Sequence, residues 1–233
     1  MIKIKEKLKD LICMFDVIGN LCPETDVCFM PDGIHIKAIH PSNHCIVILK
    51  IDKNMFEEYD IEGEETYTLN IDLLNKILNI SNRNELKLSV AEGKMNIVGM
   101  DRSFALKYFV GEPSIRKRPD IVTTSKWNID SKSFFNVISD LTMFGTNCKM
   151  YGNVDLTFHI ISDMVEGDIK LNAEMIESDN CYSFYDLTYL NMIKKSEELF
   201  DKMSVEFGSE TPLIITGKNE HMDFEFILAA RME

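Results

Sequence analysis

Apolar residues recur three and four positions apart in four short segments of the chain, the spacing of a helix with one buried face. We expect helices of about two to four turns there. Their apolar positions are Leu8, Leu11, Ile12, Phe15 and Ile18; Leu73, Leu74, Ile77 and Leu78; Phe134, Val137, Ile138 and Leu141; and Leu187, Leu190 and Ile193. Asp72, Asp130 and Ser131 stand where an N-cap or first-turn residue is expected.

Between these segments apolar and polar residues alternate, which predicts strands. In the first half the predicted strands cover residues 27–30, 33–39, 46–51, 66–71, 85–90, 94–100 and 104–110. In the second half they cover residues 125–129, 154–161, 167–172, 202–208, 212–217 and 223–230. Turns are predicted at PDG, AEGK and YGN, since each contains glycine between two strand patterns. The pattern therefore predicts a mostly β protein with few helices.

The second half of the chain repeats the first. Three segments recur in the same order: DVIGNL (16–21) as NVISDL (136–141), DLLNKIL (72–78) as DLTYLNMI (186–193), and KLSV (87–90) as KMSV (202–205). A repeat of this length exceeds the ~20 to 50 residues of solenoid units. It indicates two similar domains with related cores.

The segment between the two copies lacks any hydrophobic period. It contains two prolines and the basic triplet Arg116–Arg118, which is typical of a connector. The triplet is either a nucleic-acid contact or a solvated linker surface. The predicted division is an N-terminal domain of residues 1–110, a connector of residues 111–126 and a C-terminal domain of residues 127–233.

Composition places the chain among folded, non-membrane proteins. Of its 233 residues 45% are hydrophobic and 27% charged, a balance typical of globular domains. Apolar runs stay far below the ~18 residues of a membrane span, and the charged N-terminus does not resemble a signal peptide, so we expect a cytoplasmic protein. The six cysteines form no CxxC pair and are expected as reduced thiols. A net charge of −13 argues against a general nucleic-acid binder, so any DNA contact must be local.

No motif in the chain carries catalysis or metal binding. His40 and His44 have the spacing of a helical metal pair, but the surrounding pattern is that of a loop entering a strand. The sequence GKNE at Gly217 lacks the preceding glycine and the following hydroxyl residue of a phosphate-binding loop. We therefore expect neither an enzyme nor a cofactor or metal.

Several segments, in their order and spacing, resemble the proliferating cell nuclear antigen (PCNA) family, the DNA sliding clamps of archaea, eukaryotes and some viruses. They are PDGIHIKAIHPSNHCIVILKI (31–51), GDIKLN (167–172), DLTYLNMIKK (186–195) and TPL (211–213) before the final LAAR. The resemblance spans essentially the whole chain. It implies an α+β fold of two duplicated β-rich domains, each with antiparallel sheets and two helices, that forms one third of a six-domain ring.

The resemblance also implies a function without catalysis. Clamps of this family encircle duplex DNA as trimeric rings and tether replication and repair enzymes through peptide docking. The implied partners are double-stranded DNA bound without sequence specificity, DNA polymerase and other enzymes with clamp-binding peptides, a clamp loader and two further copies of the chain. Such a protein is cytoplasmic and associated with replicating DNA, or nuclear if it comes from a eukaryotic virus.

By the same resemblance, the subunit interface joins two edge strands. One strand contains Phe104, Leu106, Tyr108 and Phe109, and the strand of the neighbouring subunit contains Ile169 and Leu171. A charge at Tyr108 or Phe109 is expected to weaken ring assembly more than domain folding.

The helices would line the hole of such a ring, with Lys9, Lys76, Lys132, Lys194 and Lys195 facing DNA. Asn, Ser and Thr occupy several other positions on these faces, so the lining is only mildly basic. Few phosphate contacts predict weak, salt-sensitive DNA association, with the ring retained by topology. A solvated helix surface is the alternative explanation for each lysine.

The resemblance places a client-peptide pocket beside the connector. Carried over by position, it consists of Ile39, Asn43, Ile121, Tyr189, Pro212, Ala229 and Ala230. Two positions depart from the family pattern: Asn43 rather than His44 stands where the family usually has histidine, and Ala230 stands where it usually has proline.

Two alternatives remain beside a self-sufficient clamp. One is a specialised paralogue, either a subunit of a heterotrimer or a clamp-like regulator with a weakened DNA role. The other is an acidic two-domain enzyme whose site is assembled from residues distant in sequence.

Overall fold

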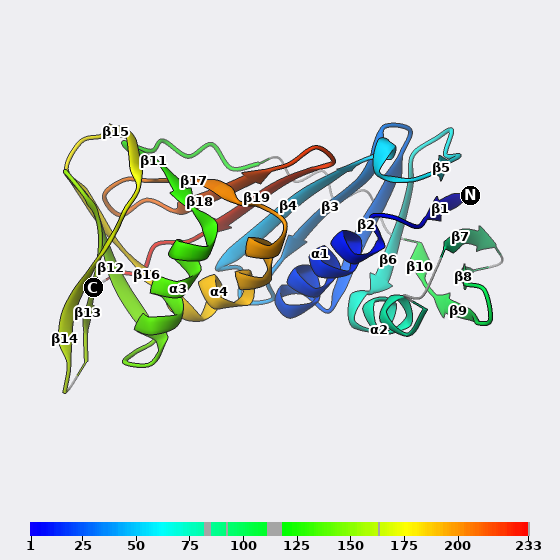
Figure 1. The fold of residues 1–233 in the computed structure, drawn as a ribbon, viewed down its shortest axis with the longest axis horizontal. Coiled ribbons are helices and arrows are strands. Elements are labelled where there is room, and N and C mark those ends of the chain that lie inside the picture. The colour runs from blue at the N-terminus through cyan, green and yellow to red at the C-terminus, as the bar shows by residue number, and fades with distance from the viewer. Residues whose placement is uncertain (82–84, 92, 111–117, 163, 233) are drawn as a thin grey trace. The chain divides into compact units, whose positions relative to one another are not determined.

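The computed structural model describes residues 1–81, 85–91, 93–110, 118–162 and 164–232, with two compact units (Figure 1). The N-terminal unit contains Met1–Ile39, the described residues 47–110 and Asn219–Asp223. The C-terminal unit contains His40–Ile46, the described residues 118–218 and residues 224–232. Each unit therefore takes a short segment from the half of the sequence that otherwise forms the other.

Two antiparallel sheets and two helices form the N-terminal unit. Its elements are β1 (Ile2–Ile4), α1 (Leu8–Leu21), β2 (Glu24–Met30), β3 (Gly33–Ile39), β4 (Cys45–Asp52), the 3-10 turn η1 (Lys53–Met55), β5 (Glu58–Tyr59), β6 (Glu65–Asn70), α2 (Ile71–Ser81), β7 (Leu86–Ala91), β8 (Lys94–Val98), β9 (Ser103–Lys107) and β10 (Phe109–Val110). The strand orders are β5-β1-β7-β8-β9 and β10-β6-β2-β3-β4. The helices α1 and α2 pack against each other.

The C-terminal unit has the same plan. Its elements are β11 (Ser125–Asp130), α3 (Ser131–Thr142), β12 (Asn147–Gly152), β13 (Leu156–Ile161), β14 (Glu166–Leu171), β15 (Glu174–Ser178), β16 (Cys181–Asp186), α4 (Leu187–Met192), the 3-10 turn η2 (Lys194–Glu198), β17 (Lys202–Phe207), β18 (Leu213–Lys218) and β19 (Met222–Leu228). The strand orders are β14-β13-β12-β16 and β19-β18-β17-β11-β15.

The strand orders confirm the predicted α+β fold and its duplication. The order β5-β1-β7-β8-β9 is matched by β15-β11-β17-β18-β19, and β6-β2-β3-β4 is matched by β16-β12-β13-β14. The repeated tetrapeptides KLSV and KMSV lie on β7 and β17, where they pair with β1 and β11. Equivalent positions of the two units can therefore be read from these registers.

The helices begin and bury one face as their sequences dictate. Asp130 caps α3, because its Oδ1 accepts a hydrogen bond of 2.8 Å from the amide of Ser133. Asn70 caps α2 in the same way, because its Oδ1 accepts a hydrogen bond of 2.8 Å from the amide of Leu73. Asp72 therefore lies in the first turn of α2. All five apolar positions predicted for α1 are buried. Burying one such side chain stabilises a fold by about 1.5–3 kcal/mol.

Five strands escaped the sequence pattern, namely β1, β5, β12, β15 and β16; β5 has only two residues. The strand β1 has only three residues, and the first four residues of β15 are all exposed, so neither shows the alternation of a half-buried strand. The buried faces of β12 and β16 carry Cys, Ser and Gly among their residues, which weakens the apolar signal.

Two elements have other bounds in the structure than the sequence predicted. The fourth helix stops at Met192, because the amide of Ser196 (2.9 Å) and its hydroxyl (2.7 Å) both bond the carbonyl of Ile193 and start a 3-10 turn there. The predicted strand of residues 104–110 is two strands, β9 and β10, which belong to different sheets. Among the described residues, no helix is long and apolar enough to cross a membrane.

Candidate functional site

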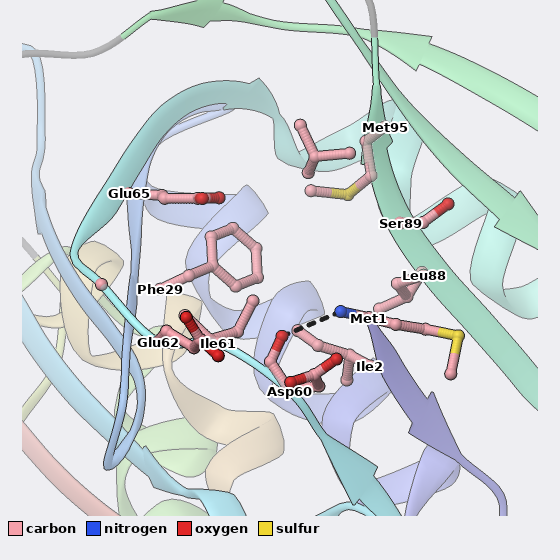
Figure 2. A pocket seen from close by; sticks show the side chains of 12 residues that line it. Met1, Ile2, Phe29, Asp60, Ile61, Glu62, Glu65, Leu88, Ser89 and Met95 are labelled. Atoms are coloured by element: carbon pink, nitrogen blue, oxygen red, sulfur yellow. Dashed lines mark hydrogen bonds between the residues drawn. The ribbon is translucent and has the colours of Figure 1, made fainter.

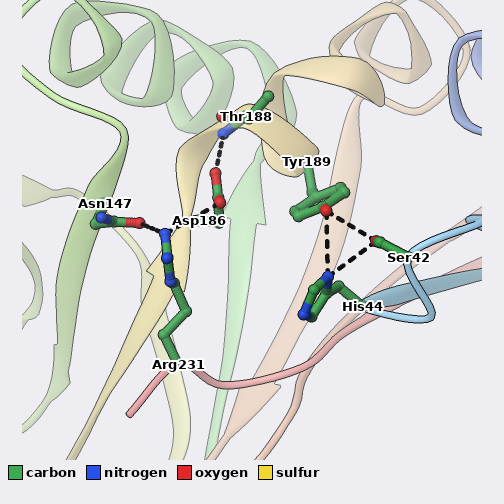
Figure 3. Close-up of polar contacts among 7 residues, drawn as sticks. All are labelled: Ser42, His44, Asn147, Asp186, Thr188, Tyr189 and Arg231. Atoms are coloured by element: carbon green, nitrogen blue, oxygen red, sulfur yellow. Dashed lines mark hydrogen bonds and ion pairs between the residues drawn. The ribbon is translucent and has the colours of Figure 1, made fainter. Parts of the chain in front are cut away.

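Three polar side chains meet at Tyr189 in the C-terminal unit (Figure 3). The hydroxyls of Tyr189 and Ser42 share a hydrogen bond of 2.9 Å, and Nδ1 of His44 lies 2.9 Å from the Ser42 hydroxyl and 3.3 Å from the Tyr189 hydroxyl. The ring of His40 meets that of Tyr189 edge-on, with 5.0 Å between the centroids. Figure 3 shows Ser42 and His44 both pointing toward Tyr189. These residues form what we call the Tyr189 cluster: His40, Ser42, His44 and Tyr189.

A tight turn presents this cluster. The amide of Asn43 donates to the carbonyl of His40 over 2.7 Å, and the amide of His40 donates to the carbonyl of Cys45 over 3.0 Å. Asn43 takes a φ of 60°, the left-handed region that asparagine tolerates better than most residues. The turn therefore uses Asn43 for its backbone and leaves His44 to face Tyr189.

The C-terminal tail runs beside the cluster. The amide of Ala229 donates to the carbonyl of His44 over 2.8 Å, and the amide of Arg231 donates to the carbonyl of Phe184 over 2.8 Å. The Arg231 guanidinium also bonds Asn147 and lies 3.2 Å from a carboxylate oxygen of Asp186, whose other oxygen caps α4 (Figure 3). Backbone and charge contacts thus hold the tail at residues 229 and 231.

The seven predicted pocket residues lie partly in this region. Tyr189 belongs to the cluster, Ala229 bonds the carbonyl of His44, and Ala230 lines a hollow of about 280 Å³ with Phe184 and Arg231. Ile121 and Pro212 are half-buried in the same unit, whereas Ile39 ends β3 in the N-terminal unit. The assignment of these residues to a client peptide stays a prediction.

Sequence reasoning missed Ser42 and His44. By ungapped register the prediction chose Asn43, but His44 is the residue whose side chain contacts Tyr189. The left-handed turn at Asn43 shifts the inward-facing position by one residue. The sequence did offer one signal: His44 is a polar loop residue directly before the strand β4, which begins at Cys45.

Lysines and acids alternate on the exposed helix surfaces. Lys9, Lys76 and Lys132 are exposed on α1, α2 and α3, and Lys195 is exposed on η2. Lys194 is half-buried and donates to the Ser139 hydroxyl over 2.8 Å. The acids of the same three helices are Asp10, Asp16, Asp72 and Asp140. Three lysines therefore stand against four acids on these three helices, so the helices carry no net positive charge and are less basic than the mildly basic lining expected from the sequence.

The two predicted interface strands, β9 and β14, each lie at the edge of their sheet. On both, one leucine (Leu106 and Leu171) is buried within its own unit. Phe104 and Ile169 are half-buried. Each strand thus offers backbone groups to a partner strand while its buried side chains serve its own core.

Tyr108 and Phe109 make contacts within the chain. The ring of Tyr108 lies 4.3 Å from that of Tyr67, and Phe109 pairs with Thr68 on β6 while its side chain stays 75% exposed. Their predicted role in the subunit interface stays untested.

Among the described residues, no group of three or more His, Cys, Asp and Glu side chains could hold a metal ion. The six cysteines are free thiols. Burial raises the pKa of Cys148 to about 12, which keeps that thiol protonated and unreactive at neutral pH.

Two comparisons of the sequence show which known proteins the chain resembles. Residues 4–102 match the family model for the N-terminal domain of proliferating cell nuclear antigen. The DNA polymerase sliding clamp of Methanococcus maripaludis strain C7 is 24% identical over 97% of this chain and 96% of its own length. The chain is thus similar to PCNA-family clamps along nearly its whole length. A second relative, the DNA polymerase sliding clamp of Pyrococcus abyssi, is 23% identical over 89% of this chain and 88% of its own length.

Solved PCNA structures share the fold. The crystal structure of PCNA from Entamoeba histolytica matches with a TM-score of 0.90, 20% identity and coverage of 99% of this chain and 98% of that one. An A. fulgidus PCNA with the C-terminal region of FEN-1 bound matches with a TM-score of 0.88, 22% identity and coverage of 100% and 99%. At these identities the likeness concerns the PCNA fold itself.

Proposed function

We propose that the chain is a DNA sliding clamp, a non-enzymatic processivity factor that encircles duplex DNA as a trimeric ring. The observation that carries this proposal is a likeness to proteins named DNA polymerase sliding clamp over 97% of the chain. The near-neutral helix surfaces fit a ring that is held on DNA by topology rather than by affinity. Its partners are duplex DNA, DNA polymerase, other enzymes with clamp-binding peptides, and a clamp loader.

The ring closes by strand pairing in this proposal. The edge strand β9 of one subunit pairs with the edge strand β14 of the next, a head-to-tail contact that closes after three copies. Exposed residues of β14 include Glu166 and Asp168, and exposed residues of β9 include Lys107. Opposite charges across the contact favour the correct partner.

Solution mass tests the ring. Light scattering over a concentration series should give three times the mass of the chain. Ile169→Glu on the edge strand β14 should shift the mass toward that of one chain while the circular-dichroism melting temperature stays within a few degrees. Ile161→Glu, on the neighbouring strand β13 where this isoleucine is 69% exposed, is the control and should remain trimeric. A persistent monomer in the unmodified protein would favour the heterotrimer subunit or clamp-like regulator instead.

Topological binding is tested without a loader. A linear duplex with biotin at both ends is incubated with the protein and then blocked with streptavidin. A clamp that has threaded onto it should remain bound in high salt, whereas duplex with one open end should release it. Equal release from both duplexes would overturn encirclement.

Peptide docking at the Tyr189 cluster is the second half of the proposal. A peptide from the FEN-1 C-terminal region is the probe, since that region is bound in a similar PCNA structure. Tyr189→Ala and His44→Ala should each weaken binding by about tenfold, the loss of about 1.4 kcal/mol. Phe144→Ala, at a 47% exposed phenylalanine outside the cluster and outside the hollow beside Ala230, is the control and should bind as the unmodified protein does.

A further inference from the structure

Three aromatic side chains lie together on the sheet β14-β13-β12-β16 of the C-terminal unit. The ring centroids are 6.0 Å apart for Tyr151 on β12 and Tyr182 on β16, and 6.4 Å apart for Tyr182 and Phe184. Tyr182 is 43% exposed, and the other two rings are half-buried. On the opposite face of the sheet Phe158 is buried against Phe134 of α3. The three rings therefore lie on the face that α3 does not cover, since successive residues of a strand point to opposite faces.

The ammonium group of Lys149 lies over all three rings. Its Nζ is 3.9 Å from the centroid of Tyr182, 4.9 Å from that of Phe184 and 5.3 Å from that of Tyr151. A cation is attracted to the face of an aromatic ring, so the three ring faces turn toward one place. A hollow of about 310 Å³ lies there, lined by Lys149, Tyr151, Phe184 and His159 among others. We call Lys149 and the three rings the aromatic platform.

The duplicated sheet of the N-terminal unit is built without such rings. Asn70 and Asp186 each cap the second helix of their unit, and they pair with Glu24 and Asn147. Counting along the paired strands from there gives three equivalent pairs: Cys28 and Tyr151, Thr66 and Tyr182, and Thr68 and Phe184. Small side chains therefore suffice at these positions for the strand order that both units share. The rings are a property of the C-terminal unit and not a requirement of the fold.

Basic side chains accompany the platform. Lys149 contributes one positive charge at its centre, and Arg231, which pairs with β16, contributes another beside it. Two carboxylates adjoin the platform, and each contacts a basic side chain. Asp186 lies 3.2 Å from the Arg231 guanidinium, and Asp168 lies 2.8 Å from Nδ1 of His159. The platform thus combines exposed ring faces with cations, and the acids next to it are held by basic partners.

The N-terminal unit surrounds an aromatic ring with the opposite charge. Phe29 lines a hollow together with the carboxylates of Asp60, Glu62 and Glu65. Figure 2 shows these three acidic side chains around the ring of Phe29. Carboxylates repel phosphate groups, because like charges raise the energy of a contact. A ligand that carries both planar rings and phosphates is therefore expected on the platform of the C-terminal unit and not beside Phe29.

We propose that the aromatic platform binds single-stranded DNA, with bases stacked on its rings and a phosphate at Lys149. Ring faces that stack bases and cations that follow the backbone are how proteins hold single strands without reading their sequence. The ring centroids lie 6.0 and 6.4 Å apart, wider than the ~3.4 Å between stacked bases of a duplex. Unstacked bases of a single strand fit this spacing, whereas the base faces of a duplex are covered by their neighbours. The choice of DNA over RNA rests on the proposed clamp function; the platform itself does not.

Fluorescence anisotropy on the full chain tests the proposal. The probe is a fluorescein-labelled dodecathymidylate, and its matched control has the same sugar–phosphate backbone without bases. The thymidylate should bind saturably, and the abasic strand should bind weaker by about tenfold or more, because it has nothing to stack. Equal binding of the two strands, or tighter binding of the RNA dodecauridylate, would overturn the proposal. The titration needs no closed ring, so a chain that fails to thread onto duplex DNA should still bind the thymidylate.

Substitutions in the platform locate the binding. Tyr151→Ala should weaken the thymidylate by about tenfold, whereas Tyr151→Phe keeps the ring and should stay within about twofold. Lys149→Gln should reduce the slope of log affinity against log salt concentration by about 0.7, the contribution of one phosphate contact on a single strand. Cys28→Ala, at the position equivalent to Tyr151 in the N-terminal unit, is the control and should bind as the unmodified protein does. Unchanged affinity in Tyr151→Ala, or a loss of FEN-1 peptide binding in its place, would overturn the proposal, the latter by assigning the platform to a protein partner.

Discussion

The two units have the same topology, but equivalent positions of their cores are buried to different extents. In the C-terminal unit β11 has six residues, and Trp127 is 1% exposed at its centre. In the N-terminal unit the equivalent strand β1 has three residues, and Val90, the equivalent of the buried Val205, is 36% exposed. Both strands pair with the strand that carries the repeated tetrapeptide, so the strand order is the same although the two equivalent valines differ in burial.

Removing the indole of Trp127 from the C-terminal unit should have the largest effect on stability. Trp127→Ala should lower the free energy of unfolding by about 3–5 kcal/mol, because it leaves a cavity where β11 meets β17. Urea unfolding followed by circular dichroism measures the loss. Hydrogen exchange of β11 and β17 should accelerate, whereas exchange of β7 and β8 should not.

Val205 pairs with Trp127, and Val90 is the equivalent residue on β7. Replacing each of these two valines provides a control for the comparison of the two units. Val205 is buried and Val90 is 36% exposed. Val205→Ala should therefore cost more stability than Val90→Ala, because the side chain of Val90 is already partly in contact with water. Equal losses would show that the two positions are not packed differently and would break the comparison.

The helix pairs of the two units also differ, in the polar contact that joins them. In the N-terminal unit the side chain of Asn75, 6% exposed, donates to Asp16 over 2.8 Å. In the C-terminal unit the more accessible Lys194 donates to Ser139. Loss of the buried contact should cost more, because burial leaves polar groups without water to replace the partner.

Asn75→Ala should accordingly destabilise the protein by about 1–3 kcal/mol. Lys194→Met, which keeps the length of the side chain, should cost less than about 1 kcal/mol. Segment-resolved hydrogen exchange of α1 and α3 separates the two effects. A larger loss from Lys194→Met would reverse the assignment of the buried contact to the N-terminal unit.

The sequence predicted those elements whose burial pattern is strong and local. The four helices and the strands carrying KLSV and KMSV were found because each buries a regular apolar face. The strand β15 was missed because its exposed residues give no alternation. Local patterns thus decide element type, but only for elements with one clearly buried side.

Features set by pairing and turns were not predictable in this way. The resemblance named Tyr189 but not His44, because the left-handed turn at Asn43 determines which neighbouring residue faces Tyr189. Which residue of β7 lies opposite which residue of β1 depends on the register of the two strands. That register is a property of two strands distant in sequence, so no single segment reveals it.

A smaller difference lies at the start of the first helix of each unit, and it depends on pH. Hydrogen bonds from the hydroxyl and the amide of Ser133 hold the pKa of Asp130 below its ordinary value. The carboxylate therefore stabilises α3 fully above the unfolded-state pKa, about 3.9, and this stabilisation is lost as the pH falls through the lower folded-state pKa.

Asp130→Ala should cost about 1 kcal/mol at neutral pH. The difference from the unmodified protein should shrink below about pH 4. Asp130→Asn is the control, since asparagine caps helices as well as aspartate does but does not titrate. Melting temperatures measured from pH 7 to pH 3 show whether the difference closes. A gap between Asp130→Ala and the unmodified protein that persists at pH 3 would contradict the assignment of the cap to the carboxylate.

A substitution at the start of α1 should have the smallest effect on stability, and this effect is a gain rather than a loss. It begins after Lys7, whose side chain makes no capping hydrogen bond, so its first amides lack the partner that Asp130 gives α3. Lys7→Ser should supply a hydroxyl acceptor there and raise stability by about 0.5–1 kcal/mol. Hydrogen exchange of the first turn of α1 should slow, with α3 unchanged. Lys5→Ser, an exposed position before the helix, changes the charge equally and should leave exchange in α1 as it is; slowing in both variants would assign the gain to charge rather than to the cap.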